Sequence, residues 1–285
     1  MHTRRIGEVE VGAVGLGAMP MSIEGRPDEA RSLATLHAAL DAGVTLIDTA
    51  DAYHVGADEV GHNETLIARA LASHDRGGDV LVATKGGHLR PGDGSWTLDG
   101  SPGHLKRACE ASLRRLGVEA IGLYQFHRPD PCVPYAESVG AVRELLDEGK
   151  IRMAGISNAG PEQIRQAGEI LGGRLVSVQN QFSPAFRSSE PELELCGELG
   201  IAFLPYSPFG GIARAGELAL DHAPFARMAR RHGVSAHQVC LAWMLARSPV
   251  VVPIPGASRP ESVRDSVAAA GLALSAEDVA ELDAA

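Results

Sequence analysis

Short apolar runs recur along the whole chain, and most of them are bounded by Gly, Pro, Asp or Asn. Each run is almost continuously apolar, which is the pattern of a strand buried on both faces. A buried helix segment can give the same pattern, so the neighbouring segments must decide between the two. We predict strands over 13–16, 44–47, 80–83, 121–126, 151–156, 175–178, 202–204 and 250–254.

Longer segments between these runs carry apolar residues at helical spacing. In the first of them, Leu33, Leu36 and Leu40 recur at intervals of three and four. Three later segments begin with Pro, which is tolerated in the first turn because its missing N–H has no intrahelical partner there. The predicted helices are 28–40, 64–72, 105–116, 136–146, 161–171, 191–199, 235–245 and 260–270.

This alternation of strand and helix predicts an α/β fold with parallel strands, because a parallel neighbour is reached only through a long connection. A closed (β/α)8 TIM barrel fits better than an open doubly wound sheet. Strand and helix alternate about eight times, and no Pro/Ser-rich linker divides the chain. We therefore predict one domain over 1–285, with an N-terminal segment (3–9) and a final helix (275–282) outside the repeat.

Composition narrows the range of functions. The formal net charge of −10 disfavours a general nucleic-acid binder, which needs a basic face to neutralise phosphates. The four cysteines are scattered and form no close pair of the kind found in zinc sites, so we predict no metal. No apolar stretch reaches the length of a signal peptide or a membrane span, which predicts a cytoplasmic protein without a membrane partner. These patterns leave the oligomeric state open.

Polar side chains cluster directly after the predicted strands, where the loops of a (β/α) barrel converge and hold its chemistry. Taken singly, Asp48 reads as a turn residue, Tyr53 as a packing aromatic and His127 as a core histidine. Lys85 alone reads as a solvated lysine. The residues at strand ends are Asp48, Lys85, His127, Ser157, Asn158, Gln179, Asn180, Tyr206 and Ser207. Their common position predicts a single site.

Asp48, Lys85 and His127, together with Tyr53 in the loop after Asp48, make a usable proton donor. A phenol such as Tyr53 has a free pKa near ~10 and releases its proton reluctantly at neutral pH. An ammonium beside it, from Lys85, lowers that pKa, and the carboxylate of Asp48 keeps the lysine charged despite burial. The imidazole of His127 can hydrogen-bond the substrate oxygen. This set suits the stabilisation of an alkoxide formed when hydride reaches a carbonyl carbon.

The chain resembles the aldo-keto reductase family in a series of short motifs that follow the family's order over nearly its whole length. The matching motifs are Gly15-Leu16-Gly17, Asp48-Thr49-Ala50-Asp51-Ala52-Tyr53, Gly61-His62-Asn63-Glu64, Ala83-Thr84-Lys85, residues 113–116, residues 124–127, Gly155-Ile156-Ser157-Asn158, Gln179-Asn180-Gln181, Pro205-Tyr206-Ser207-Pro208 and Pro253-Ile254-Pro255-Gly256. The resemblance implies an NAD(P)H-dependent enzyme that reduces an aldehyde or ketone, a small-molecule carbonyl substrate, to an alcohol.

The same resemblance assigns roles to individual residues. The catalytic tetrad falls on Asp48, Tyr53, Lys85 and His127, with Tyr53 as the general acid. The nicotinamide carboxamide is expected at Ser157, Asn158 and Gln179, and Tyr206 is expected to stack on the ring. The pyrophosphate is expected along Ser207, Phe209 and Gly211.

The adenosine end of the cofactor is expected at residues 256–266. Ser258 and Arg259 offer a hydroxyl and a guanidinium to a 2′-phosphate, with Arg264 as a second candidate and Asp265 as a further cofactor contact. Many family members have Lys at the position of Gly256 and Glu-Asn where this chain has Asp265-Ser266. The guanidinium argument favours NADPH, and NADH stays open.

Of three other classes of protein, the sequence excludes one and leaves two open. A Rossmann fingerprint is not met, because Pro20 occupies its third glycine position. A cofactor-binding regulatory subunit and a metal-assisted hydrolase using His62, His88 and His127 are the two alternatives.

The loops after the strands also supply candidates for binding the substrate. Predicted substrate contacts are Met19, Met21, His88, Trp96, Phe186 and Phe209. The long connection 86–103 is a candidate mobile lid.

Overall fold

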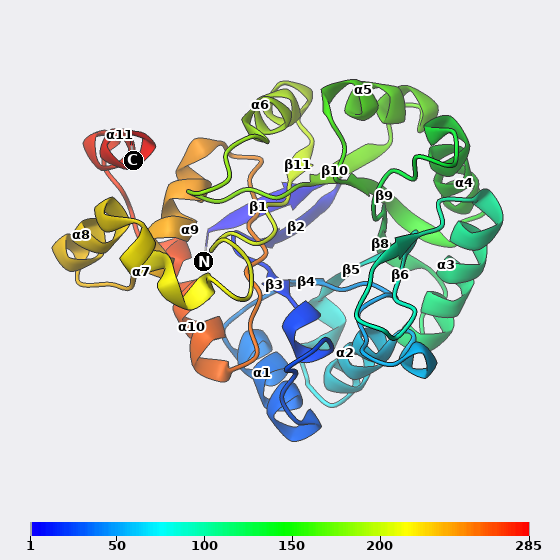
Figure 1. Cartoon of the computed structure of the whole chain (residues 1–285), viewed down its shortest axis with the longest axis horizontal. Coiled ribbons are helices and arrows are strands. Elements are labelled where there is room, and N and C mark those ends of the chain that lie inside the picture. The colour runs from blue at the N-terminus through cyan, green and yellow to red at the C-terminus, as the bar shows by residue number, and fades with distance from the viewer. Residues whose placement is uncertain (1, 285) are drawn as a thin grey trace.

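A curled sheet of seven parallel strands forms the centre of the computed structural model, which describes residues 2–284 (Figure 1). In spatial order the strands are β3 (Leu16–Gly17), β4 (Leu46–Asp48), β5 (Leu81–Gly86), β8 (Ile121–Phe126), β9 (Ile151–Ser157), β10 (Leu175–Gln179) and β11 (Ala202–Phe203). The register pairs Asp48 with Ala83, Lys85 with Gln125, and Gln179 with Ser157. The polar strand ends therefore lie at one edge of the sheet.

Residues 250–256 close this sheet into a barrel. Parallel bridges join Val251 to Phe203 of β11 and Gly256 to Gly17 of β3. The backbone N–H of Gly17 donates to the carbonyl of Pro255 at 2.9 Å. The predicted run 250–254 thus takes the eighth position but forms no regular strand, because Pro253 and Pro255 have no N–H for the ladder. The predicted (β/α)8 barrel is confirmed.

A helix follows each barrel strand and packs outside the sheet (Figure 1). Side-chain N-caps hold three of the helices, since the side chains of Asp28, Ser101 and Ser235 accept hydrogen bonds from backbone N–H groups three residues ahead. The eight helices are α1 (Glu29–Asp41), α2 (His62–Ala72), α3 (Pro102–Leu116), α4 (Tyr135–Asp147), α5 (Pro161–Ile170), α6 (Glu190–Leu199), α9 (Ala236–Arg247) and α10 (Pro260–Ala268). Each overlaps its predicted segment.

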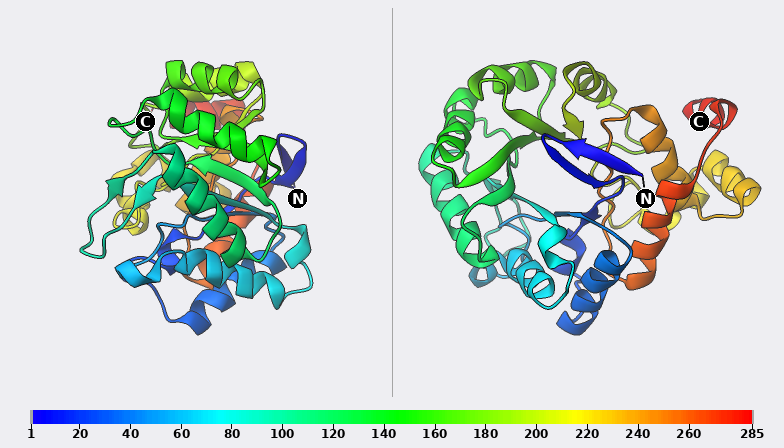
Figure 2. Two further views of the ribbon diagram at one scale, coloured as in Figure 1. Left: turned by 90° about the vertical axis from the view of Figure 1, so that its right-hand side faces the viewer. Right: turned by 180° about the vertical axis from the view of Figure 1, so that it is seen from behind.

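An antiparallel hairpin closes the end of the barrel opposite the polar strand ends. It consists of β1 (Thr3–Ile6) and β2 (Val9–Gly12), which lie in front of the sheet in the right-hand view of Figure 2. Its buried side chains Ile6 and Val11 join the barrel residues Leu46 and Leu123 in one apolar cluster. The predicted segment 3–9 therefore corresponds to the first strand and the turn of this hairpin.

Two regions differ from the sequence prediction. The helices α7 (Leu218–Asp221) and α8 (Ala223–His232) lie between β11 and α9 and were not predicted, although Phe225, Met228 and Ala229 are buried at helical spacing. The connection 86–103 contains a short hairpin of β6 (His88–Leu89) and β7 (Thr97–Leu98).

The final predicted helix corresponds to α11 (Ala276–Asp283). The predicted domain 1–285 includes residues 1 and 285, which lie outside the described residues. Within 2–284, every helix is too short or too polar to cross a bilayer.

Candidate active site

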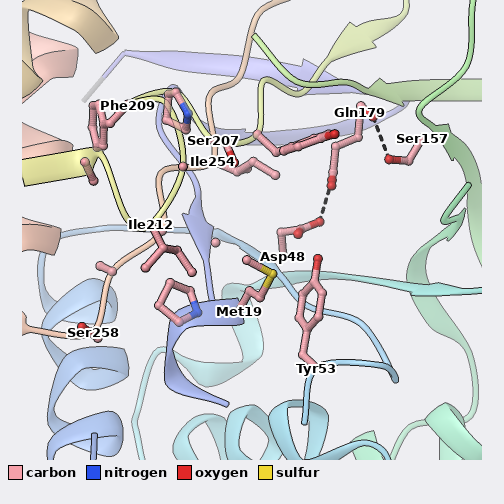
Figure 3. A pocket seen from close by; sticks show the side chains of 18 of the residues that line it. Met19, Asp48, Tyr53, Ser157, Gln179, Ser207, Phe209, Ile212, Ile254 and Ser258 are labelled. Atoms are coloured by element: carbon pink, nitrogen blue, oxygen red, sulfur yellow. Dashed lines mark hydrogen bonds between the residues drawn. The ribbon is translucent and has the colours of Figure 1, made fainter. Parts of the chain in front are cut away.

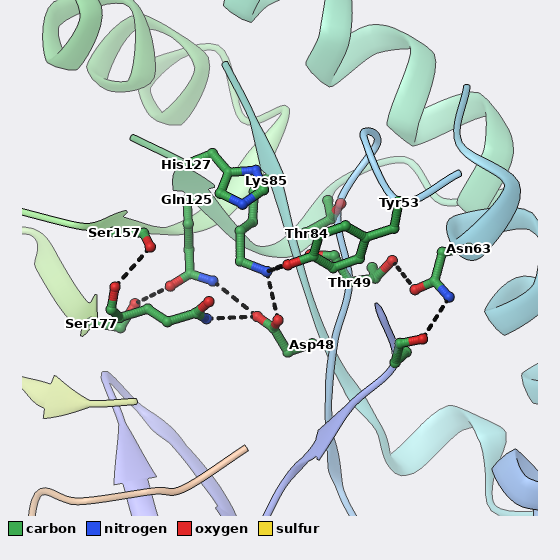
Figure 4. Close-up of polar contacts among 12 residues, drawn as sticks. Asp48, Thr49, Tyr53, Asn63, Thr84, Lys85, Gln125, His127, Ser157 and Ser177 are labelled. Atoms are coloured by element: carbon green, nitrogen blue, oxygen red, sulfur yellow. Dashed lines mark hydrogen bonds and ion pairs between the residues drawn. The ribbon is translucent and has the colours of Figure 1, made fainter. Parts of the chain in front are cut away.

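Lys85 lies at the centre of a buried polar network at the C-terminal ends of β4 and β5 (Figure 4). Its ammonium Nζ donates to Asp48 Oδ1 at 2.5 Å, to the carbonyl of Thr49 at 2.8 Å and to Tyr53 Oη at 3.0 Å. The Lys85 side chain is 0% exposed. The structure thus brings together three residues that the sequence separates by as many as 37 positions.

Asp48 is held by both of its carboxylate oxygens. Oδ2 accepts hydrogen bonds from Gln179 Nε2 at 2.7 Å and from Gln125 Nε2 at 3.3 Å. These amides satisfy the lone pairs that Lys85 does not reach, which a buried carboxylate requires. Sequence reasoning missed Gln125, although an amide inside the apolar run of β8 was a usable signal.

The loop that carries Tyr53 is also fixed by buried hydrogen bonds. Thr49 Oγ1 donates to Asn63 Oδ1 at 2.6 Å, and Asn63 Nδ2 donates to the carbonyl of Ala18 at 2.9 Å. The start of α2 and the loop after β3 therefore anchor the turn between Asp48 and Tyr53. The phenol reaches the end of the Lys85 side chain from this turn (Figure 4).

Burial and charge act in opposite directions on these groups. Burial raises the pKa of Tyr53 above 10, and the Lys85 charge only partly offsets this rise. Burial would lower the pKa of Lys85, but the charge of Asp48 and the contact with Tyr53 outweigh it and raise that pKa. The lysine therefore stays charged and the phenol stays protonated at neutral pH. The charge of Lys85 lowers the Tyr53 pKa, as the sequence analysis expected, but burial has the larger effect and the net pKa is raised.

His127 stands beside Tyr53 at the end of β8. The two ring centroids are 5.9 Å apart in an edge-on arrangement. Burial, followed by the charge of Lys85, lowers the pKa of His127 well below 6.5. Its imidazole is neutral at physiological pH and carries one N–H. His127 Nδ1 is buried without a hydrogen-bond partner among residues 2–284.

The predicted nicotinamide contacts form a second cluster next to this network. Ser157 Oγ donates to the carbonyl of Gln179 at 2.7 Å, and Asn158 Nδ2 donates to the carbonyl of His127 at 3.0 Å. Tyr206 Oη donates to Asn158 Oδ1 at 2.7 Å. Asn158 has a left-handed backbone (φ 58°), which asparagine tolerates better than most residues.

A cavity of about 690 Å³ runs past both clusters, and Figure 3 places Ser258 on the opposite side of it from Ser157 and Gln179. Of the predicted residues, Asp48, Tyr53, His127, Ser157, Asn158, Gln179, Tyr206, Ser207, Phe209, Gly211, Ser258 and Arg259 line this cavity. Lys85 lies behind Asp48 and Tyr53. Arg128 and Ser262 also line the cavity and were not predicted. Ser262 lies in the first turn of α10, within the segment 256–266 where the adenosine end was expected.

Two predicted cofactor contacts lie elsewhere. Arg264 is exposed on α10 and is not among the described residues that line the cavity. Asp265 accepts hydrogen bonds from Ser235 Oγ at 2.7 Å and from Gln238 Nε2 at 2.6 Å. Its carboxylate therefore joins α10 to the start of α9.

The predicted substrate contacts are also divided. Met19, His88, Trp96 and Phe209 line the cavity, whereas Met21 is fully buried in the core and Phe186 is exposed outside it. The His88 ring lies 4.6 Å from that of His127 and 5.0 Å from that of Trp96.

The metal-site alternative gains no support from this arrangement. His62 is bonded to Ser22 Oγ at 2.9 Å, away from the pair of His88 and His127. Across 2–284 no three His, Cys, Asp or Glu side chains gather as a metal site would require.

Asp51 is a buried carboxyl that is not part of the polar network around Lys85. It is 5% exposed, and its Oδ1 has no hydrogen-bond partner within residues 2–284. Burial, together with the nearby charge of Glu64, raises its pKa to about 8. Below that pH the folded protein retains a proton that the unfolded chain releases near pH ~4.

We expect Asp51→Asn to stabilise the protein, and to do so more as the pH rises from 5 to 8. The raised pKa means that wild-type stability falls over this window, and a neutral amide removes the titration. The gain in unfolding free energy at pH 8 should be on the order of 2–5 kcal/mol. Urea unfolding at pH 5, 6.5 and 8 measures it, with Asp75→Asn at an exposed position as the control. A gain that does not grow with pH would contradict this account.

Comparison with known proteins gives one consistent result. The sequence model of the aldo/keto reductase family matches residues 13–285. An uncharacterized oxidoreductase of Schizosaccharomyces pombe is 37% identical over 99% of this chain and 89% of its own length. A probable aldo-keto reductase of Glycine max is 32% identical over 96% of this chain and 85% of its own.

Solved structures agree with the sequence comparison. The crystal structure of an aldo/keto reductase from Klebsiella pneumoniae in complex with NADP and acetate matches with a TM-score of 0.82 and 30% identity. The match covers 99% of this chain and 94% of that one. The fold, the length of the match and the sequence identity coincide, and the chain therefore belongs to the aldo/keto reductase family of oxidoreductases.

Proposed function

We propose that this enzyme reduces an aldehyde or ketone with NADPH and that Tyr53 is the general acid. The family generally carries out NAD(P)H-dependent carbonyl reduction, so the proposal concerns the acid, the cofactor preference and the residues that serve them. The observation that carries it is the contact of Lys85 Nζ with both Asp48 and Tyr53, while the phenol lines the cavity.

The hydrogen bond from Lys85 determines what the phenol can do. Lys85 Nζ donates to Tyr53 Oη at 3.0 Å, so this oxygen accepts a bond there while its own O–H remains available to a substrate oxygen. When that proton is transferred, the ammonium stabilises the phenolate that remains. Asp48 keeps the ammonium charged throughout. The neutral imidazole of His127 donates its N–H to the same carbonyl oxygen and orients it.

The other cavity residues fit a nicotinamide dinucleotide. A bound reduced nicotinamide would supply the hydride to the carbonyl carbon. Amide and hydroxyl groups of Ser157, Asn158 and Gln179 surround the catalytic end, where Tyr206 offers an aromatic face. Ser207, Phe209 and Gly211 also line the cavity, and we place the pyrophosphate against them.

The far end of the cavity suits a phosphate. Ser258, Arg259 and Ser262 place two hydroxyls and a guanidinium at the start of α10, where helix N–H groups also favour an anion. We assign the 2′-phosphate of NADPH to this end. Arg264 and Asp265 have no part in this assignment, because the described cavity does not include them.

Replacing Arg259 by Ala should raise the KM for NADPH by roughly 10–100-fold and change that for NADH less than about threefold, since only NADPH presents a 2′-phosphate to the guanidinium. Steady-state kinetics with both cofactors measure the effect. Arg264→Ala, which removes a guanidinium outside the cavity from the same helix, is the matched control. Equal losses with both cofactors in Arg259→Ala would contradict the assignment.

The function itself is tested by following NADPH and NADH consumption with a panel of aldehydes, ketones and sugars. We expect turnover with at least one class of carbonyl compound and a preference for NADPH. Tight NADPH binding without turnover on the whole panel would instead indicate a cofactor-binding regulatory subunit.

A further inference from the structure

Arg128 is a cation in the active-site cavity, and no carboxylate of the described residues pairs with it. It follows His127 directly and lines the cavity beside Asn158 and Tyr206. Its Nη2 donates to Asn158 Oδ1 at 2.9 Å, and its Nε is buried with no acceptor among residues 2–284. Within the described chain, 2–284, its guanidinium forms no ion pair, whereas most other partly buried arginines face an acid. A partly buried charge of this kind requires an explanation.

The proposed reduction does not use this charge. Asp48 is the one acidic side chain among the described residues that line the cavity, and it is already paired with Lys85. Arg128 follows the proposed catalytic residue His127 directly, and burial, then the charges of Lys85, His88 and Arg128, lower the pKa of His127 well below 6.5. Among the described residues, the catalytic end of the cavity therefore carries one positive charge without a counterion.

We propose that Arg128 binds a carboxylate of the substrate, so that the substrates are carbonyl compounds with a carboxylate near the carbonyl group. This inference rests on the proposed function. The planar guanidinium matches a carboxylate with two parallel hydrogen bonds and stays charged at every physiological pH. Met19, His88 and Trp96 line the same cavity and provide an apolar wall for the carbon skeleton, with Trp96 39% exposed at its edge.

A second role for the guanidinium would be to hold the cofactor site. Asn158 Oδ1 accepts from both Arg128 and Tyr206, so Arg128 helps to position this amide. Arg128 also hydrogen-bonds the Tyr206 side chain. These positioning contacts leave other N–H groups of the five on arginine available, and they make no distinction between charged and neutral substrates. Substrate charge therefore separates the two roles.

The experiment compares acids with their esters in wild type and variants. The two pairs are benzoylformate with methyl benzoylformate, and 3-formylbenzoate with its methyl ester, which place the carboxylate at two distances from the carbonyl. The variants are Arg128→Gln, Arg128→Lys and Arg165→Gln, the last at an exposed position on α5. The readouts are kcat/KM for each compound and Kd for NADPH from quenching of protein fluorescence.

We expect Arg128→Gln to lower kcat/KM for at least one acid by about 10–100-fold and to change that of its ester less than about threefold. Arg128→Lys should keep part of the activity with the acid, Arg165→Gln should match wild type, and Kd for NADPH should hold within about threefold. Equal losses for acid and ester with weaker NADPH binding would overturn the proposal in favour of the positioning role.

Failure of this proposal is distinguishable from failure of the proposed function. A wild-type enzyme that reduces neutral aldehydes but neither acid overturns the carboxylate proposal and leaves carbonyl reduction intact. A wild-type enzyme that binds NADPH and reduces no compound overturns the proposed function itself.

Discussion

Replacing Tyr53 by Phe is expected to lower kcat for carbonyl reduction by roughly 10²–10⁴-fold, the usual contribution of a positioned general acid. The change removes one oxygen, which is the atom that accepts from Lys85 and faces the cavity. The ring itself remains, and so do its edge-on contact with His127 and its position 4.9 Å from Lys85 Nζ. Loss of turnover would therefore report on the proton and not on packing.

The measurement combines steady-state kinetics with NADPH binding. Kd for NADPH should stay within about threefold of wild type, because the proposed cofactor contacts lie on other residues. Tyr135→Phe is the matched control, since it removes a buried phenol oxygen on α4 that has no hydrogen-bond partner within residues 2–284. A Tyr53→Phe enzyme that keeps a tenth or more of wild-type kcat would rule out Tyr53 as the acid.

The barrel was predictable because its signals are local. A strand buried on both faces reads as an apolar run, and the run 121–126 coincides with β8. Helix starts are also marked locally, as at Asp28 and Ser235, whose side chains accept from the first helical turn. The polar residues after β4, β5 and β8 met at one site because the C-terminal ends of parallel strands share an edge.

The parts that could not be predicted depend on contacts between distant segments. Gln125 sits inside an apolar run, and only the barrel shows that its amide reaches Asp48 on another strand. The helix α8 lies outside the alternation of strands and helices, so the repeat did not predict it. Asp265 was expected at the cofactor because of its place in the chain, but its side chain turns to Ser235 on α9.

The largest combined effect on stability and activity is expected for Lys85→Met. The change leaves the buried Asp48 carboxylate without its cation, and breaking a buried ion pair in this way costs about 3–5 kcal/mol of unfolding free energy. The phenolate of Tyr53 also loses the charge that stabilises it, so kcat should fall by ~10³-fold or more. Urea unfolding and steady-state kinetics measure the two effects separately. Lys106→Met, which removes a more exposed lysine paired with Glu144, is the control and should change stability by less than about 1 kcal/mol.

The double variant Lys85→Met/Asp48→Asn separates the two roles of the lysine. With the carboxylate also neutralised, no unpaired charge remains in the core, and most of the lost stability should return. The amide that replaces the Asp48 carboxylate keeps one oxygen, which can still accept from Gln179 and Gln125. Activity should not return, because stabilising the phenolate requires a cation beside Tyr53 Oη. If the double variant recovered both stability and turnover, Lys85 would be a structural counterion to Asp48 and the proposed acid would work without it.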